Sequence, residues 1–267
     1  MILLTGSAGF IGSRVKLALG DAPTTTLDRK PGADLEMDLL DLGSPCEVDT
    51  VIHLAAHADI SRNWTDDASR QQLYADNILA LISLLEALRG VKRFVFVSTA
   101  AVAAGSKSPY VASKIAGEAL VQAYAHKHGW AWECIRLVSC VGPGYHHGHV
   151  ADFCKMAREG GVIRALNSGV IRNPFVHVDD AAAAIVKASQ CPALRATYVA
   201  GQTWGWRDTV EVMRELGEVL TVEAPDNLEG WTGDPHLGGI MSDYTCSRSV
   251  KDGVVDAVRE LMRGGGK

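Results

Sequence analysis

Short apolar runs alternate with segments of helical periodicity from Met1 to Val138. The apolar runs predict strands at residues 2–4, 24–27, 35–37, 51–54, 93–97 and 132–138. The periodic segments between them predict helices at 12–19, about 68–88 and about 110–127. Because the strands are nearly all apolar and alternate with helices, we expect a parallel sheet that is buried on both sides. The pattern predicts the α/β class, with a doubly wound parallel sheet.

Beyond residue 138 the alternation becomes less regular. Helices are predicted at about 150–159, 179–189, 207–216 and 249–262, and strands at 174–178 and 198–200. Asp179 is expected to be the N-cap of the helix that it begins. The second part of the chain is therefore expected to be a smaller and less regular region.

Composition argues against several classes of partner. The 267 residues carry a formal net charge of −5, so nucleic acid or another polyanion is not an expected partner. No apolar run approaches the roughly 20 residues of a membrane-spanning helix, and no signal peptide precedes the first strand. The six cysteines include no CxxC pair. We therefore expect a cytoplasmic protein without a membrane partner.

A glycine-rich turn follows the first predicted strand and opens the first predicted helix. Gly6 permits the tight turn, Gly9 lets the backbone approach a pyrophosphate, and Gly12 lets the helix pack closely on the strand. Asp28 ends the second strand, 28 − 6 = 22 positions after Gly6, near the spacing of about 20 for a carboxylate that binds a ribose diol. This carboxylate should repel a 2′-phosphate, so we expect NAD. The basic Arg29 leaves NADP as the less favoured cofactor.

Tyr110 and Lys114 stand four positions apart in Ser-Pro-Tyr-Val-Ala-Ser-Lys. On a helix this spacing places both side chains on one face, where the ammonium lowers the pKa of the phenol. A phenol tuned in this way can exchange a proton with an alcohol near neutral pH, while the dinucleotide exchanges hydride. The two motifs together predict carbonyl/alcohol redox chemistry.

Together with further segments, these motifs resemble the extended short-chain dehydrogenase/reductase superfamily, and most closely its nucleotide-sugar epimerase/dehydratase branch. The resemblance covers about residues 1 to 216 and is carried by 5–12, 53–56, Asn77, Ser98-Thr99, Tyr110-xxx-Lys114, 136–144, 175–180 and 198–201. It implies a Rossmann-like NAD-binding domain over 1–165, to whose sheet residues 172–200 return. Residues 143–170 and 201–267 would form a small substrate-binding region.

The resemblance also implies roles for individual residues. Thr99 would hydrogen-bond the reacting sugar oxygen, Tyr110 would be the acid/base, and Lys114 would bind the nicotinamide ribose. The residues expected to bind the cofactor are Gly6, Gly9, Phe10, Ile11, Gly12, Asp28, Arg29, Asp38, Leu39, Leu54, Ala55, Ala56, Asn77, Val97, Ser98, Tyr110, Lys114 and Val141. In the family, the helices at about 68–88 and 110–127 pair across a two-fold axis, so a homodimer is expected.

The expected reaction is NAD-dependent epimerisation of a nucleotide sugar through a keto intermediate, with Tyr110 removing a hydroxyl proton. Release of the intermediate would instead make the protein an NAD(P)-dependent sugar, uronate or aldehyde dehydrogenase/reductase. A non-catalytic dinucleotide sensor is the third alternative. Dehydratases of the family carry an acidic pair after the Ser/Thr. Ala100 and Ala101 stand there, so dehydration is not expected.

The predicted substrate region departs from the family pattern at two arginines that hold a diphosphate. Asn173 stands at the position of the first arginine, and Trp231 and Thr232 occupy the stretch that carries the second. The residues considered as replacements are Arg164, Arg172, Arg207 and Arg248. The substrate is therefore less well defined than the cofactor.

Histidines occur in one loop and in two predicted strands. His146, His147 and His149 are expected to border the substrate cleft; zinc binding is the less favoured interpretation, and no metal is expected. His53 and His177 are expected to pack or to form hydrogen bonds within the protein rather than to act in catalysis.

Cys140 and three tryptophans each have two interpretations. Cys140 is expected to be a small buried residue, although it lies where some family members use a thiol as an acid. The tryptophans would either stack on a ligand or fill a small core, and neither role is favoured; they are Trp204, Trp206 and Trp231.

Overall fold

The computed structural model describes residues 1–43, 45–58, 66–103, 105, 107–164, 172–191, 194–223 and 242–264. The chain divides into two compact units. Unit 1 consists of Met1–Leu137 and Ala182–Tyr198, and unit 2 of Val138–Ala181 and Val199–Lys267.

Unit 1 is built on a seven-stranded sheet with the order β12-β8-β7-β5-β1-β2-β3. The strands are β1 (Ile2–Thr5), β2 (Thr24–Asp28), β3 (Leu35–Glu36), β5 (Thr50–His53), β7 (Arg93–Thr99), β8 (Ala131–Leu137) and β12 (Leu194–Val199). β1 pairs in parallel with β2 on one side and with β5 on the other. The strand order therefore reverses beside β1, and ligands of such sheets bind at the carboxyl ends of the strands at this point. The doubly wound α/β class predicted from the apolar runs is confirmed.

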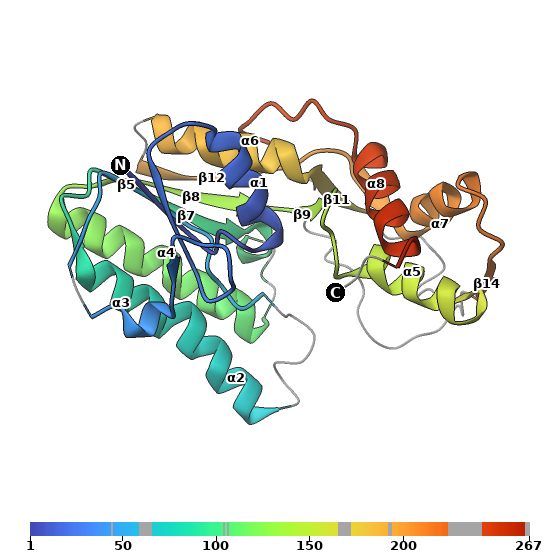
Figure 1. Cartoon of the computed structure of the whole chain (residues 1–267), viewed down its shortest axis with the longest axis horizontal. Coiled ribbons are helices and arrows are strands. Elements are labelled where there is room, and N and C mark those ends of the chain that lie inside the picture. Colours follow the sequence, from blue (N-terminus) through green and yellow to red (C-terminus); the bar gives the residue numbers. More distant parts are fainter. Residues whose placement is uncertain are drawn as a thin grey trace. The chain divides into compact units, whose positions relative to one another are not determined.

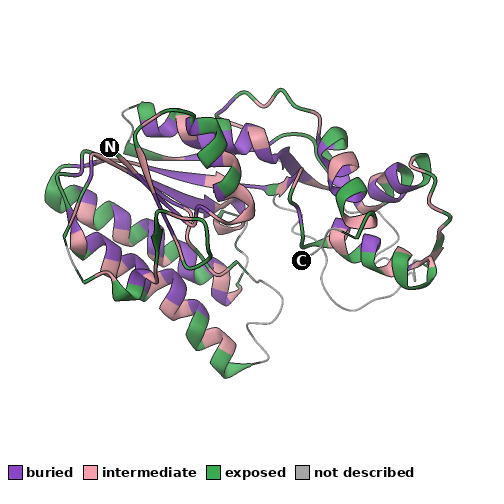
Figure 2. Cartoon of the chain, in the orientation of Figure 1, coloured by how far each residue is buried: buried purple, intermediate pink, exposed green. Residues whose placement is uncertain are grey.

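Helices cover both faces of this sheet (Figure 1). α1 (Phe10–Leu19) and the unit 1 part of α6 (Val178–Gln190) lie on one face, and α3 (Ala80–Ala87) and α4 (Pro109–His128) lie on the other. Two short strands, β4 (Cys46–Glu47) and β6 (Leu88–Arg89), pair in parallel beside them. Figure 2 shows that the strands between the helices are mostly buried, which explains their nearly all-apolar sequences.

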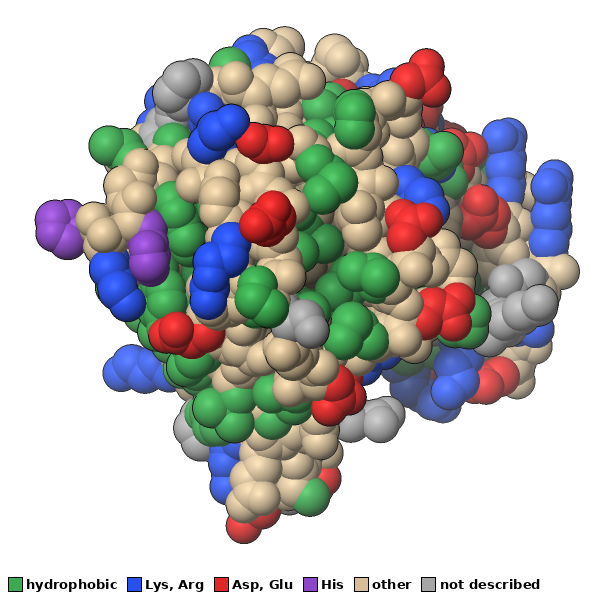
Figure 3. Space-filling view, turned by 60° about the vertical axis from the view of Figure 1, so that its left-hand side comes forward, with side chains coloured by type: hydrophobic (Ala, Val, Ile, Leu, Met, Phe, Trp, Pro, Cys, Tyr) green, Lys and Arg blue, Asp and Glu red, His purple; other side chains and the backbone are tan. Residues whose placement is uncertain are grey.

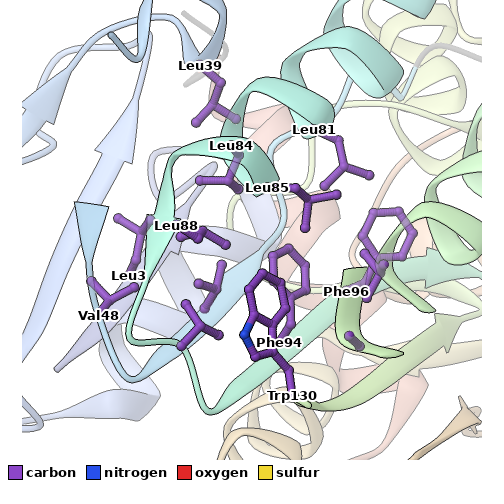
Figure 4. Packing of buried hydrophobic residues seen from close by; sticks show 14 of the residues in the cluster. Leu3, Leu39, Val48, Leu81, Leu84, Leu85, Leu88, Phe94, Phe96 and Trp130 are labelled. Carbon is purple, nitrogen blue, oxygen red and sulfur yellow. The ribbon is translucent and has the colours of Figure 1, made fainter. Parts of the chain in front are cut away.

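The α3–β7 contact forms a large part of the unit 1 core (Figure 4). Leu81, Leu84 and Leu85 of α3 are at most 2% exposed and belong to the same cluster as Phe94 of β7. The Phe94 ring stacks on Trp130, with 6.4 Å between ring centroids. Burial of these large apolar side chains is the main favourable contribution to the stability of this layer.

α4 has clear signals at both ends. The Ser108 side chain accepts a hydrogen bond from the Val111 N–H, and Pro109 occupies the first helical position. Gly129 ends the helix with a left-handed φ of 71°. These caps place Tyr110 in the first turn of a 20-residue helix.

The helix predicted at about 68–88 is interrupted in the structure. It consists of α2 (Asp67–Tyr74), a π-helical segment η2 (Ala75–Leu79) and α3. The wider turn of η2 holds Asp76 and Asn77, which are both buried. Local widening of this kind is frequent at functional sites.

Unit 2 contains three short strands that form their own sheet, in the order β13-β11-β9. They are β9 (Ser139–Val141), β11 (Arg172–His177) and β13 (Thr203–Gly205). A second pair consists of β10 (Val162–Arg164) and β14 (Thr221–Glu223), and the helices are α5 (His149–Gly160), α7 (Trp206–Glu215) and α8 (Val250–Met262). The segment 172–200 is therefore divided between two sheets: β12 joins the seven-stranded sheet of unit 1, whereas β11 joins the three-stranded sheet of unit 2.

Asp179 is not the N-cap of α6, contrary to the sequence prediction. The helix already begins at Val178, and Asp179 lies in its first turn. The Asp179 N–H donates to Nδ1 of His177, which therefore supplies the capping acceptor. A histidine in a strand gives no sequence signal for this role.

The described surface carries charges of both signs. On the face that Figure 3 shows, Lys and Arg side chains alternate with Asp and Glu, and small apolar groups lie between them. Within the described part of the chain, no helix combines the length and the apolar character that a bilayer span needs.

Candidate active site

The glycine turn between β1 and α1 forms a cradle at the carboxyl end of the central strands. A Cβ at Gly12 would lie 2.0 Å from the Gly6 carbonyl oxygen, and one at Gly6 would lie 2.6 Å from the Ala55 nitrogen. Gly6 also has a left-handed φ of 72°. No side chain caps the N-terminus of α1, which begins after Gly9. Its first N–H groups and the close backbone approach suit a pyrophosphate.

A cavity of about 320 Å³ opens beside this cradle. Its lining combines the glycine turn, the ends of β2 and β5, and η2; it consists of Gly6, Gly9, Leu27, Asp28, Arg29, Lys30, Met37, Leu39, Leu54, Ala55, Ala56, His57, Asp76 and Ala80. Eight of the 18 residues expected to bind the cofactor therefore line one cavity, which has apolar walls and the Asp28 carboxylate at its edge. The residues present fit a dinucleotide.

Asp28 is fixed at the edge of this cavity by two backbone N–H groups. Its Oδ2 accepts from Ala8 at 2.9 Å, and its Oδ1 accepts from Lys30 at 2.9 Å. The carboxylate thus lies against the glycine turn, where the prediction of a ribose-binding residue requires it.

Arg29 bridges two carboxylates instead of standing free beside Asp28. Its Nε lies 3.0 Å from Asp38 Oδ2, and its Nη2 donates to Asp76 Oδ1 at 2.5 Å. The hydrogen bond to Asp76 is the main cause that raises the Arg29 pKa. Because Asp28, Asp38 and Asp76 surround this guanidinium, the site is unfavourable for a 2′-phosphate.

Asn77 connects the strand end after β5 with α4. Its Oδ1 accepts from the His57 N–H at 2.6 Å, and its Nδ2 donates to the His57 oxygen at 3.0 Å and to Ser113 Oγ at 2.9 Å. Ser113 Oγ in turn donates to the Tyr110 carbonyl oxygen at 2.7 Å. The buried Asn77 therefore fixes the first turn of α4 rather than lining the cavity.

Lys114 lies one turn after Tyr110 on α4, as the spacing predicted. It is 4% exposed, its Nζ donates to the Val97 carbonyl oxygen at 2.8 Å, and the Nζ lies 5.9 Å from the Tyr110 ring centroid. Burial lowers the Lys114 pKa to about 8, against an opposing effect of the Glu118 charge. The ammonium is thus held between the end of β7 and the phenol.

Thr99 is the last residue of β7 and caps a short 3-10 helix, η3 (Ala100–Val102). Its Oγ1 accepts from the Ala101 N–H at 3.3 Å, and η3 packs against α4. The last residues of β7 and the first turns of α4 therefore bring together Thr99, Tyr110 and Lys114, the three residues expected to be catalytic.

Sequence reasoning missed a buried polar group behind this site. Glu118 of α4 accepts hydrogen bonds from Arg136 of β8 and from Ser98 of β7. Glu118 stands four positions after Lys114, so the helical spacing that singled out Tyr110 and Lys114 could have indicated it.

In unit 2, three of the four arginines considered for a diphosphate form ion pairs. Arg164 pairs with Glu223 at 3.2 Å, Arg172 with Asp208 at 2.9 Å, and Arg248 lies 3.8 Å from a carboxylate oxygen of both Asp179 and Asp180. The fourth, Arg207, places its guanidinium 5.5 Å from the Trp206 ring centroid. Within the described part of the chain, the buried Asn173 Oδ1 has no hydrogen-bond partner.

The three neighbouring histidines are held by different contacts, and His149 is the first residue of α5 rather than part of the loop. His146 Nδ1 lies 3.0 Å from the Gly144 oxygen, whereas His149 Nε2 lies 2.9 Å from Thr209 Oγ1. His147 stacks on Tyr145. Among the residues that the structure describes, no three His, Cys, Asp or Glu side chains are grouped as a metal site requires.

Other candidates are part of the packing. His53 is 1% exposed, contacts Thr5 Oγ1 at 2.8 Å and stacks on Phe96. In unit 2, Cys140 lies in β9 with a pKa that burial raises to about 12, and Val141 is fully buried. The Trp204 Nε1 donates to Thr209 Oγ1 within the core. Trp231 and Thr232 lie outside the described residues.

The chain is similar in sequence to a family of known proteins. The model of the NAD-dependent epimerase/dehydratase family matches residues 2–201. The chain is 28% identical to the UDP-glucuronate 4-epimerase of Thermodesulfobacterium geofontis, over 67% of this chain and 68% of that one. It is also 28% identical to the UDP-glucose 4-epimerase of Mycolicibacterium smegmatis, over 93% and 91% of the two chains.

Solved structures show the same fold. A UDP-galactose 4-epimerase superposes with a TM-score of 0.78 at 24% identity, over 98% of this chain and 99% of that one. The UDP-glucuronic acid 4-epimerase of Bacillus cereus, solved in complex with NAD, superposes with a TM-score of 0.78 at 22% identity, over 98% and 97%. Since the family model matches three quarters of the chain, the protein belongs to the NAD-dependent epimerase/dehydratase family, and NAD is its cofactor.

Proposed function

We propose that this protein is an epimerase that acts on a nucleotide sugar through a transient keto intermediate. The observation that carries the proposal is the arrangement of Tyr110 and Lys114 on α4 beside the last residues of β7, in the same unit as the dinucleotide cavity. A sensor would need the cavity alone and not an ammonium buried next to a phenol.

The reaction assigns one task to each of three side chains. Tyr110, as the phenolate, takes the proton of a sugar hydroxyl, and Thr99 Oγ1 hydrogen-bonds the same oxygen. The Lys114 ammonium stabilises the phenolate and binds the nicotinamide ribose. Bound NAD would supply the hydride-transfer chemistry at the carbinol carbon in both directions. Epimerisation requires that the keto intermediate turn so that the hydride returns to its other face, while Tyr110 gives the proton back to the carbonyl oxygen.

The NAD-binding residues follow from the cavity. Gly6, Gly9 and Gly12 would hold the pyrophosphate at the start of α1, and Asp28 would accept hydrogen bonds from the adenosine ribose. Leu39, Leu54, Ala55 and Ala56, which line the cavity, would supply its walls.

A second function, with a different substrate class, is favoured by the state of the arginines. Asn173 replaces an arginine, and Arg164, Arg172 and Arg248 are paired with carboxylates. A guanidinium already neutralised in this way binds a diphosphate less strongly. A dehydrogenase or reductase for a sugar or uronate without a nucleotide would need no such arginines.

One experiment separates the two functions. Purified protein with NAD is incubated with UDP-glucose, UDP-glucuronate, the corresponding free sugars and free uronates, and product stereochemistry is followed by NMR with absorbance at 340 nm. The epimerase produces a new stereoisomer of a nucleotide sugar without accumulating reduced cofactor. If a free sugar or uronate instead yields stoichiometric NADH and no nucleotide sugar is converted, the protein is a dehydrogenase and the epimerase proposal is wrong.

We further propose a homodimer formed through α4 and the helices before it, as the family resemblance implies. Two large apolar side chains are exposed there, Leu79 of η2 at 56% and Ile115 of α4 at 49%. Sedimentation of the wild type and of Ile115→Glu tests this pairing: the substitution should shift a dimer towards monomers.

A further inference from the structure

Three side chains follow one another along α4 at intervals of four residues: Tyr110, Lys114 and Glu118. This spacing places them in one column along the helix. Lys114 is 4% and Glu118 is 5% exposed. Buried charges are retained only where partners and hydrogen bonds compensate their loss of hydration. The contacts of Glu118 therefore show what holds it there.

Glu118 joins α4 to two neighbouring strands. Its Oε1 accepts from Ser98 Oγ of β7 at 2.6 Å and from Arg136 Nε of β8 at 2.9 Å, and its Oε2 accepts from Arg136 Nη2 at 2.7 Å. Ser98 and Arg136 are direct neighbours in the register of the two strands. The two-pronged Arg136 contact fixes both oxygens of the carboxylate.

The far side of Arg136 is also fixed. Its Nη1 donates to the Tyr198 hydroxyl at 2.7 Å, and its guanidinium lies 5.4 Å from the centroid of the same ring. The Glu118 carboxylate is thus held between Ser98 of β7, the strand that ends at Thr99, and the Arg136 guanidinium, which Tyr198 holds in turn. Such a rigid, hydrogen-bonded anion is suited to act on a charge one turn away.

Several groups surround the Lys114 ammonium. Tyr110 and Glu118 face it from α4, His53 lies on β5 and Cys134 on β8. η2 also packs against α4, and its Asp76 is bonded to Arg29. His53 is neutral at working pH because burial and the Lys114 charge lower its pKa to about 3, and burial raises the Cys134 pKa. Glu118 is therefore the carboxylate next to Lys114 that opposes the effect of burial on the ammonium.

We propose that Glu118, held by Arg136 and Ser98, is a positioning residue that acts through its charge on Lys114, one helical turn away, and keeps that ammonium protonated beside Tyr110. Three residues of α4 would then act together, with Glu118 acting on Tyr110 through Lys114. This inference rests on the proposed role of Tyr110 as acid/base. It adds that the charge of Glu118, and not only its shape, is required.

The test measures ionisation of Tyr110 without a sugar substrate. The tyrosinate absorbance near 295 nm is titrated in the NAD-loaded protein, and the titration of Tyr110→Phe in the same background is subtracted. Glu118→Gln removes the charge with the shape retained, so Lys114 loses its proton more readily and the Tyr110 phenolate should form about one pH unit higher or more. Glu118→Asp keeps the charge with a shorter reach and should titrate near the wild type.

A purely structural Glu118 gives the opposite ranking. Glu118→Asp, which cannot reach Arg136 in the same way, would then be the more disturbed variant, and Glu118→Gln would titrate like the wild type; that result overturns the proposal. Should Glu118→Gln alone fail to fold because Arg136 is left unpaired, the double variant with Arg136→Gln removes both charges. Since the lost Arg136 cation offsets part of the effect of the lost carboxylate, a smaller displacement in the same direction is then expected, and no displacement overturns the proposal. Because no sugar is present, the titration is informative even if the proposed sugar substrate is wrong. If the enzyme turns over a nucleotide sugar but Glu118→Gln does not shift the Tyr110 titration, the role of Glu118 is rejected and the proposed function stands.

Discussion

Gly117 of α4 lies so close to Phe96 of β7 that a Cβ at position 117 would stand 2.5 Å from the Phe96 Cζ. This approach brings Lys114, three residues earlier, within 2.8 Å of the Val97 carbonyl oxygen. The Phe96 ring is 2% exposed and has little room to move aside. The absent side chain at position 117 therefore sets the distance between α4 and the sheet.

Gly117→Ala is expected to lower the free energy of unfolding by about 1–3 kcal/mol, because the added methyl overpacks the contact with Phe96. Urea denaturation followed by circular dichroism measures this loss. Gly160→Ala is the matched control, because a Cβ there meets no atom within 4 Å. Equal stability of the two variants would show that α4 can shift away from the sheet without cost.

Tyr110→Phe is expected to retain NAD binding and to reduce kcat by about 10²–10⁴-fold, because it removes the proton-transferring hydroxyl while the ring remains. Turnover and the NAD content of the purified variant provide the two measurements. Tyr124→Phe removes a hydroxyl from the same helix, at a residue that bonds Glu86 rather than the site, and should stay within about twofold of the wild type. A Tyr110→Phe enzyme with near-normal kcat would remove this residue from the mechanism.

Asp28→Asn is expected to raise the affinity for NADP relative to NAD by at least about tenfold, because it removes a negative charge beside the place of a 2′-phosphate. The amide oxygen can still accept one of the two backbone hydrogen bonds from Ala8 and Lys30. Binding titrations with both cofactors measure the ratio. Asp41→Asn, at an exposed position outside the cavity, serves as the control. An unchanged ratio of NADP to NAD affinity in Asp28→Asn would mean that the adenosine ribose does not bind at Asp28.

Acid should destabilise the folded protein in part through His53. Burial, with the nearby Lys114 charge, lowers its pKa to about 3 in the folded state, against an ordinary value of 6.5. Between these values the unfolded chain binds a proton that the folded chain does not, so stability falls as pH decreases from about 6.5 towards 3. The slope from this residue is about 1.4 kcal/mol per pH unit.

The measurement is the free energy of unfolding at several pH values for the wild type and for His53→Asn. The variant should lose stability less steeply below pH 6.5, whereas His126→Asn, at an exposed position of α4, should follow the wild type. Parallel curves for wild type and His53→Asn would mean that His53 is protonated in the folded state.

Local patterns predicted the sheet and the cofactor correctly. The glycine turn, Asp28 and the Tyr110–Lys114 spacing each depend on one strand–turn–helix unit or one helical turn, so the sequence contains their geometry. The interruption of the helix at about 68–88 was not predictable, because the apolar spacing through 75–79 is compatible with an uninterrupted helix. Similarly, His177 replaced Asp179 as the capping acceptor because the start of α6 depends on where β11 ends.

By itself the sequence determined the α/β class, the family, the cofactor and the pair Tyr110–Lys114. Only the tertiary structure decided which polar side chains meet: Asn77 with Ser113, 36 positions apart, and Glu118 with Arg136, 18 positions apart. It also decided that three of the four arginines considered for a diphosphate are paired with carboxylates. The physical reason is that hydrophobic periodicity indicates which face of an element is buried, whereas a charge finds its partner only when separate elements pack together.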